Sequence, residues 1–177
     1  MYKRYVLAML ANGLLCSCMS NNAAHTAAHQ AVAPIQSAAG QNVTGTVRFV
    51  DMNNGQLLVI EDFDHLSPGP HGVHVHEKAD LSAADLSSAG PHFNPEGHQH
   101  AGPGTMERHA GDLGNVVAGA NGRAHLELVV RGLSINGPRN GVVGHSVIVH
   151  EKADDLKSQP AGESGARIGG GVIELEW

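Results

Sequence analysis

The sequence is poor in cysteine, in aromatic residues and in positive charge. Its only cysteines, Cys16 and Cys18, both stand near the N-terminus, so the rest of the chain can form no internal disulfide. Aromatic residues make up 3% of the chain, whereas glycine occurs 23 times, and this composition favours short strands and turns over a helical bundle. The formal net charge of −6 lacks the basic excess that a nucleic-acid-binding protein needs.

A long hydrophobic run is also missing. The apolar stretch over residues 5–15 follows two basic residues and is too short to span a bilayer, so residues 1–18 are predicted to be an export signal. The segment Leu15-Cys16-Ser17-Cys18 resembles a bacterial lipobox, in which cleavage before the last cysteine leaves that residue, here Cys18, lipidated. Ordinary cleavage near residues 26–28, giving a soluble periplasmic form, is the alternative. The mature protein is therefore expected in the periplasm or cell envelope, lipid-anchored to a membrane.

A flexible tether is predicted over residues 19–30, which are small and polar. Its histidines, His25 and His29, are interpreted as linker residues, with a metal-capturing arm as the alternative. The tether leads to one domain over residues 31–177, which is long enough to bury a core without a disulfide.

Alternation of apolar and polar residues predicts a succession of short β-strands. Asn54-Gly55 supplies a hairpin turn between two of them. We expect about eight strands in an all-β, antiparallel Greek-key β-sandwich or flattened barrel. The predicted strand segments are 31–37, 43–49, 56–63, 71–77, 124–130, 142–150 and 171–176.

Two connections are too long to be simple turns. Residues 78–112 are rich in glycine, proline and histidine, and residues 151–166 form a second, shorter loop. Loops of such length inside a compact domain are usually functional. We therefore expect the site to lie in these loops and at the strand ends beside them.

Histidine is over-represented, with 13 residues, and most of them fall at ligand-like spacings. His74 and His76 are two apart in a predicted strand and so point to the same face, while His150 ends an apolar strand. Imidazole and carboxylate ligands suit zinc or copper, and four of them closed to water are typical of a structural zinc site. The long loop carries His92, His98, His100, His109 and Asp112.

Five segments, in order, resemble the motifs of copper/zinc superoxide dismutases, over a match that runs from about residue 31 to the end. Residues 72–77 (GVHVHE) resemble the first copper motif, and residues 88–95 (SAGPHFNP) resemble the bridging-histidine motif. Residues 107–115 (ERHAGDLGN) are similar to the zinc motif, and residues 149–156 (VHEKADDL) to the second copper motif. Gly165-Ala166-Arg167 followed by Gly171-Val172-Ile173 resembles the closing motif.

The resemblance implies a metal set residue by residue. The implied copper ligands are His74, His76, His92 and His150. The implied zinc ligands are His92, His100, His109 and Asp112, with His92 shared between the metals. Asp154 is implied to accept hydrogen bonds from His74 and His100. The implied catalytic residues are His92 and Arg167, of which Arg167 attracts the anionic substrate.

The implied activity is dismutation of superoxide to dioxygen and hydrogen peroxide by a redox-cycling copper with a structural zinc. This activity would protect the cell envelope from superoxide. A periplasmic copper or zinc buffer on the same fold is the alternative function. Lys152 and Lys157 either add to a positive funnel near Arg167 or are ordinary solvated charges. His98 is interpreted as a solvated loop residue, and His71 as a hydrogen-bonded loop anchor.

The sequence departs from the family where most members have a disulfide, because Leu86 and Gly170 stand at the two cysteine positions. We expect the Leu86 side chain to pack against the glycine run 169–171 as an apolar plug. The C-terminal segment, with Glu174, Glu176 and Trp177, places carboxylates where the common family dimer buries apolar surface. A monomer is therefore favoured over a homodimer.

Overall fold

The computed structural model describes residues 30–176. The predicted export signal with Cys18, the histidines of the tether and Trp177 lie outside the described residues. Within residues 30–176, no helix is long and apolar enough to cross a membrane. The strands are β1 (Gln30–Ser37), β2 (Thr44–Asp51), β3 (Gln56–Asp64), β4 (Gly69–His76), β5 (Asp112–Ala118), β6 (Ala124–Arg131), β7 (Ser146–His150), β8 (Arg167–Val172) and β9 (Glu174–Glu176), with one turn of 3-10 helix, η1 (Ser87–Ala89).

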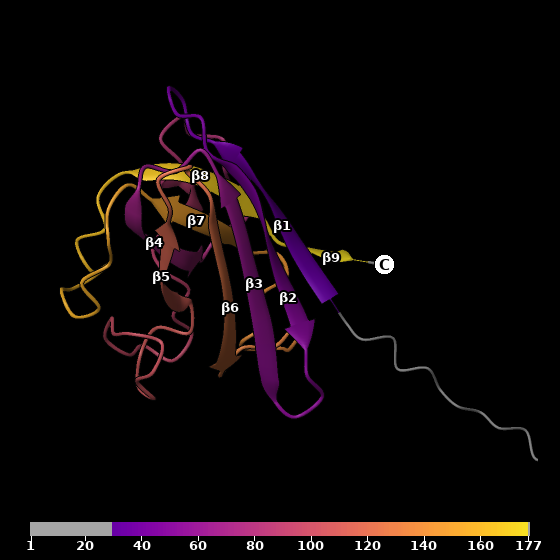
Figure 1. The fold of residues 1–177 in the computed structure, drawn as a ribbon. Coiled ribbons are helices and arrows are strands. Elements are labelled where there is room, and N and C mark those ends of the chain that lie inside the picture. The colour runs from indigo at the N-terminus through magenta and orange to yellow at the C-terminus, as the bar shows by residue number, and fades with distance from the viewer. Residues whose placement is uncertain (1–29, 177) are drawn as a thin grey trace, which may run out of the picture.

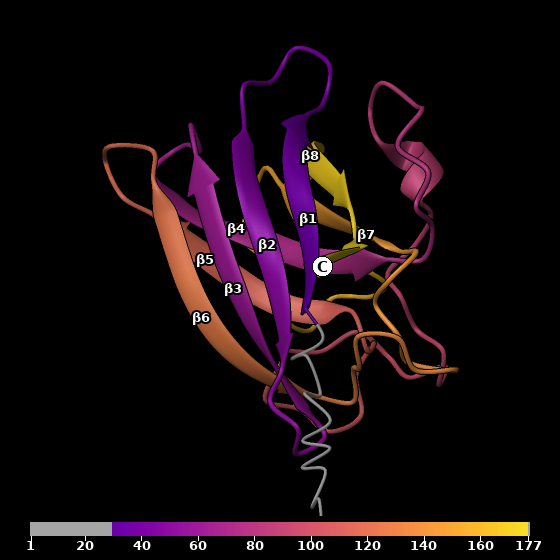
Figure 2. The ribbon, with the colours of Figure 1, turned by 90° about the vertical axis from the view of Figure 1, so that its right-hand side faces the viewer.

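The strands form one antiparallel sheet that is nearly closed into a barrel, in the order β5-β4-β7-β8-β1-β2-β3-β6. Strands β1, β2, β3 and β6 make one layer, and β4, β5, β7 and β8 cross behind it (Figure 2). Because β6 lies beside β3 and β4 lies beside β7, the connections cross the barrel as in a Greek key. The fold class predicted from the sequence is confirmed.

The first hairpin shows why these residues form strands. Val47 and Phe49 of β2 and Val59 of β3 are fully buried, whereas the residues between them are partly or fully exposed. This alternation is what a half-buried strand requires. The turn between β2 and β3 spans residues 52–55 and contains the predicted Asn54-Gly55, where Gly55 has a φ of 77° that glycine adopts without steric cost.

Three parts of the strand pattern differ from the prediction by more than a residue or two at their ends. β5 was not predicted, because most of its residues are buried and the alternation is hidden. The segment over residues 142–150 enters its strand only at Ser146, because the backbone of Val142 bonds to Ser134 and that of His145 turns back to Val142. The last predicted strand is divided between β8 and the short β9.

The two long loops lie together on one side of the barrel, at the left in Figure 1. Gln159 joins them: its Oε1 accepts a hydrogen bond from the His100 amide, and its Nε2 donates to the His100 carbonyl, each at 2.8 Å. The loops therefore form one layer over the ends of β4, β5 and β7.

Candidate metal centre

β4 supplies the first two side chains of the centre. His74 and His76 are both buried, and the strand register shifts between Val73 and His74 where β4 pairs with β5. A second shift separates Val149 from His150 in the pairing of β7 with β8. Such bulges re-aim a side chain next to functional sites, and here both occur at a histidine of the candidate centre.

The long loop returns to β4 and brings the remaining histidines with it. His92 forms an isolated β-bridge with His76, and the amide of Phe93 donates to the carbonyl of Val75 at 2.8 Å. The amide of Val75 in turn donates to the carbonyl of Gly111 at 2.9 Å. This added pairing fixes both ends of the loop on β4, so that its histidines face His74 and His76.

The first group comprises His74, His76, His92 and His150, whose ligand atoms lie within 4.8 Å of one another. One nitrogen of each ring is buried and has no hydrogen-bond partner among residues 30–176: Nδ1 of His74 and Nε2 of the other three. Buried polar atoms are normally satisfied. Four orphaned imidazole nitrogens turned to one point are the donor set that a transition metal such as copper takes.

The second group comprises His92, His100, His109 and Asp112. Asp112 Oδ1 lies 2.9 Å from Nδ1 of His92, 2.9 Å from Nδ1 of His100 and 3.3 Å from Nδ1 of His109. The other carboxylate oxygen, Oδ2, accepts the amides of Ala101 and His109, each at 3.1 Å. Three imidazoles and a carboxylate in a buried, closed group fit a structural zinc.

The two groups share His92, which offers Nδ1 to the second group and Nε2 to the first. Its ring centroid is 3.9 Å from that of His74 and 5.0 Å from that of His76. One ring therefore stands between two prospective metal positions.

Asp154 connects the groups a second time. Its Oδ2 is 2.8 Å from Nε2 of His74, and its Oδ1 is 2.9 Å from Nε2 of His100. Asn115 of β5 holds Asp154 in place with two hydrogen bonds. The Asp154 amide donates to Oδ1 of Asn115 at 2.7 Å, and Nδ2 of Asn115 donates to the Asp154 carbonyl at 2.8 Å. A carboxylate in this position fixes the ring orientation of both histidines and leaves their Nδ1 atoms free for a metal.

Burial sets the protonation of the first group. It lowers the pKa values of His74 and His76 well below the usual range, and it lowers the pKa of His150 to about 4. The pKa of Asp112 is also lowered: burial alone would raise it, but hydrogen bonds from His109 and His92 reverse the effect. Neutral imidazoles and an ionised carboxylate are the forms that bind metal.

Arg167 is the arginine or lysine that lines the opening of the centre among residues 30–176. Its Nη1 donates to the carbonyl of Leu86 and its Nη2 to the carbonyl of Gly90, each at 2.7 Å. It lines a pocket of about 550 Å³ together with His76 and His92. Within the described part of the chain, neither Lys152 nor Lys157 lines this pocket.

His98 and His71, interpreted from the sequence as a loop residue and a loop anchor, lie outside both metal groups. His98 is partly exposed, and its Nδ1 lies 3.2 Å from the carbonyl of Arg108. His71 is buried and hydrogen-bonds through Nδ1 to the carbonyl of His150 and through Nε2 to that of Ser67, each at 2.8 Å. Their positions agree with the predicted loop residue and loop anchor.

The residue at the first missing cysteine position is buried. Leu86 is 6% exposed and packs with Ala38, Ala89 and Ile148. A Cβ built on Gly170 would lie 3.2 Å from Cδ1 of Leu86. The side chain is thus an apolar plug against the glycine run, as the sequence led us to expect.

Sequence reasoning missed two residues, Asn115 and Gln159, whose hydrogen bonds hold Asp154 and His100 in place. Asn115 stands inside a motif that the sequence does show, but nothing in its pattern reveals a bond to a residue 39 positions away. Gln159 stands in a loop without any motif, and its partner His100 is 59 positions away. Both act through contacts between loops, which no local spacing predicts.

A nearly closed antiparallel barrel that carries two buried ligand groups sharing one imidazole defines a β-barrel protein with a two-metal centre. The chain belongs to the copper/zinc superoxide dismutase family, since the sequence model of copper/zinc superoxide dismutase (SODC) matches residues 43–173. The crystal structure of the clock protein EA4 is similar to it, with 38% sequence identity and a TM-score of 0.77, over 85% of this chain and 97% of that one. Family and geometry together are consistent with copper and zinc as the metals.

Proposed function

We propose that the chain is a superoxide dismutase that converts superoxide to dioxygen and hydrogen peroxide. Copper would be held by the group His74, His76, His92 and His150, and zinc by the group His92, His100, His109 and Asp112. When bound, copper supplies the one-electron chemistry of the reaction, which zinc cannot supply because it has no redox activity. The family implies superoxide as the substrate.

One observation supports this proposal above the rest: the Nε2 of His92, buried and without a partner in the described chain, belongs to a residue that lines the same pocket as Arg167. Superoxide is a small anion, and a guanidinium at the opening of a pocket attracts it even though the chain carries a net charge of −6. Superoxide also needs protons to become hydrogen peroxide. We assign delivery of one of the two protons to the Nε2 of His92, which can hold a proton only while it is not a copper ligand.

A copper or zinc buffer is the second candidate, because buried imidazole groups alone are enough for storage. Storage gives no role to Arg167, whose guanidinium is held by two backbone carbonyls beside the first group. The fold alone does not decide between them, since the clock protein EA4 has a similar structure.

The deciding experiment compares superoxide dismutation by the metal-loaded protein and its variant Arg167→Ala. A dismutase should lose about tenfold or more of its rate constant at low ionic strength, because the anion is no longer attracted. Arg139→Ala removes an exposed arginine that does not line the pocket, and it should leave the rate unchanged. Protein that retains copper and zinc but shows no rate above buffer would exclude dismutation and leave the storage function.

We further propose that the mature protein is attached to the cell envelope through a lipid on Cys18. A Cys18→Ser variant should lose the lipid, which mass spectrometry of the purified full-length protein detects, and should move to the soluble fraction. Release of wild-type protein without a lipid would favour ordinary cleavage near residues 26–28.

The domain is proposed to be a monomer. Glu174 and Glu176 are exposed on β9, and Glu176 lies only at the 4.0 Å limit of an ion pair with Arg48. Unpaired carboxylates oppose burial in an interface. Light scattering of residues 30–177 at micromolar concentration should give the monomer mass, and a stable dimer would overturn the proposal.

A further inference from the structure

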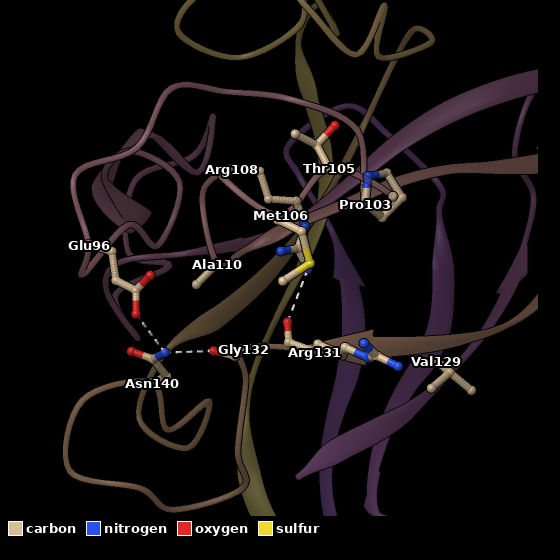
Figure 3. A pocket seen from close by; sticks show the side chains of 11 residues that line it. Glu96, Pro103, Thr105, Met106, Arg108, Ala110, Val129, Arg131, Gly132 and Asn140 are labelled. Atoms are coloured by element: carbon tan, nitrogen blue, oxygen red, sulfur yellow. Dashed lines mark hydrogen bonds between the residues drawn. The ribbon is translucent and has the colours of Figure 1, made fainter.

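A second pocket, of about 390 Å³, opens between the segment over residues 103–110 and the end of β6. It shares no lining residue with the pocket of Arg167. Figure 3 shows its side chains, with the guanidinium of Arg108 directed at the backbone carbonyl of Arg131. The lining residues that matter for its chemistry are Glu96, Thr105, Arg108, Arg131 and Asn140.

Arg108 is a buried cation that makes no close ion pair in the described chain, although the charge of Asp112 in the second metal group also acts on it. It is 7% exposed, and within residues 30–176 its guanidinium forms no ion pair and makes one hydrogen bond, from Nη2 to the carbonyl of Arg131 at 3.3 Å. Its Nε is buried and has no partner in the described chain. A buried charge is costly unless it is paired. The wall of the pocket therefore holds an unused fork of donors suited to an oxyanion.

The opposite wall adds a second cation. Arg131 is exposed, and in the described residues it too has no carboxylate partner. The carboxylate of Glu96 lies at the other end of the pocket, where its Oε1 accepts a hydrogen bond of 3.4 Å from Nδ2 of Asn140 (Figure 3). Two guanidiniums and one carboxylate therefore line the pocket.

We propose that this pocket binds a small oxyanion, of the type of inorganic phosphate. Arg108 and Arg131 would bind its anionic oxygens. The net charge of −6 repels anions from the molecule as a whole, so saturable binding here has to come from these side chains. The proposal is independent of the proposed dismutase activity, because the two pockets have no residue in common.

The test is a titration of the metal-loaded protein, with its copper reduced, with inorganic phosphate, followed by the amide resonances in ¹⁵N–¹H NMR spectra. The amides of Thr105, Met106 and Gly132 should shift together along one saturating curve. Arg131→Gln changes an exposed side chain, and it should weaken binding about tenfold or more, because a hydrogen bond to a charged group is lost. Arg139→Gln is the matched control outside the pocket and should leave the affinity unchanged.

Three results would overturn the proposal: shifts that never saturate, shifts confined to residues around Arg167, or equal affinities of the wild type and Arg131→Gln.

Discussion

The backbone carbonyl of Leu86 accepts a hydrogen bond of 2.7 Å from Nη1 of Arg167. The side chain of Leu86 meanwhile packs into a small apolar cluster beside Gly170. One residue thus orients the cation of the candidate active site and anchors its own loop to β8. Most members of the family have a disulfide between the positions of Leu86 and Gly170. In this protein the burial of the Leu86 side chain attaches the loop to β8 instead.

Replacing both residues by cysteine should restore the covalent link. A Cβ on Gly170 would lie 3.2 Å from Cδ1 of Leu86, and its closest neighbour, at 2.8 Å, is the movable end of Ile148. We expect Leu86→Cys with Gly170→Cys to form a bridge under oxidising conditions and to stabilise the fold by about 3 kcal/mol, through the lowered entropy of the unfolded chain. Scanning calorimetry should show a higher melting temperature of the oxidised than of the reduced double variant.

Two controls separate the bridge from the loss of packing. Leu86→Cys alone should melt below the wild type, because it removes buried apolar volume. Reductant should lower the melting temperature of the double variant only. A double variant that keeps both thiols free under oxidising conditions would contradict the assigned positions.

Asp154 should matter for metal retention although it contacts no metal position directly. Asp154→Asn keeps the size of the side chain but removes the charge between His74 and His100. We expect affinity for metal to fall about 10- to 100-fold, as when other carboxylates behind a ligating histidine are changed. Competition with a chelator, followed by metal analysis, measures this fall.

The neighbouring residue offers a matched control. Asp155 is exposed, and its side chain accepts hydrogen bonds from the amides of Lys157 and Ser158 and from the hydroxyl of Ser158, all in its own turn. Asp155→Asn should retain metal like the wild type. Equal losses in both variants would mean that loop charge in general, rather than the bonds of Asp154, governs retention.

Gln159 should couple the two long loops. Gln159→Ala removes both of its hydrogen bonds to the backbone of His100. Each bond contributes about 1 kcal/mol, so we expect faster release of zinc to a chelator and a lower melting temperature. Lys157→Ala, an exposed change in the same loop, should release zinc at the wild-type rate. If Gln159→Ala released zinc at the wild-type rate, Gln159 would have no role in coupling the two loops.

Residues whose contacts follow from local spacing are predictable from the sequence, and residues whose contacts join distant loops are not. His74 and His76 are predicted to share a face by strand periodicity alone, and the motifs around His92 and His109 bring the loop ligands into the same prediction. Alternation fails for β5, since a strand buried on nearly every side shows no period. Gln159 and the pocket of Arg108 depend on where loops meet in space, which composition and spacing do not encode.

Glu61 is an acidic residue inside the apolar core. It is 0% exposed, follows Val59 and precedes Phe63 on the inward face of β3, and both of its carboxylate oxygens lack a partner within residues 30–176. Burial raises the pKa of Glu61 to about 8. The folded protein therefore keeps the carboxyl protonated at neutral pH, whereas the unfolded chain ionises it near its ordinary pKa of 4.5.

This difference sets the sign of a pH dependence. Between pH 4.5 and about 8 the folded state binds one proton more than the unfolded state, so the contribution of Glu61 to stability falls as pH rises. The slope is about 1.4 kcal/mol per pH unit and ends above the folded pKa. Glu61→Gln should remove it, so the variant should be more stable than the wild type in denaturant at pH 8 and close to it near pH 4.5. Glu127→Gln replaces a side chain that is 60% exposed, and its stability should follow that of the wild type at every pH. If the plots of stability against pH were parallel for the wild type and Glu61→Gln, the core carboxyl would have to be ionised or hydrated in the folded protein.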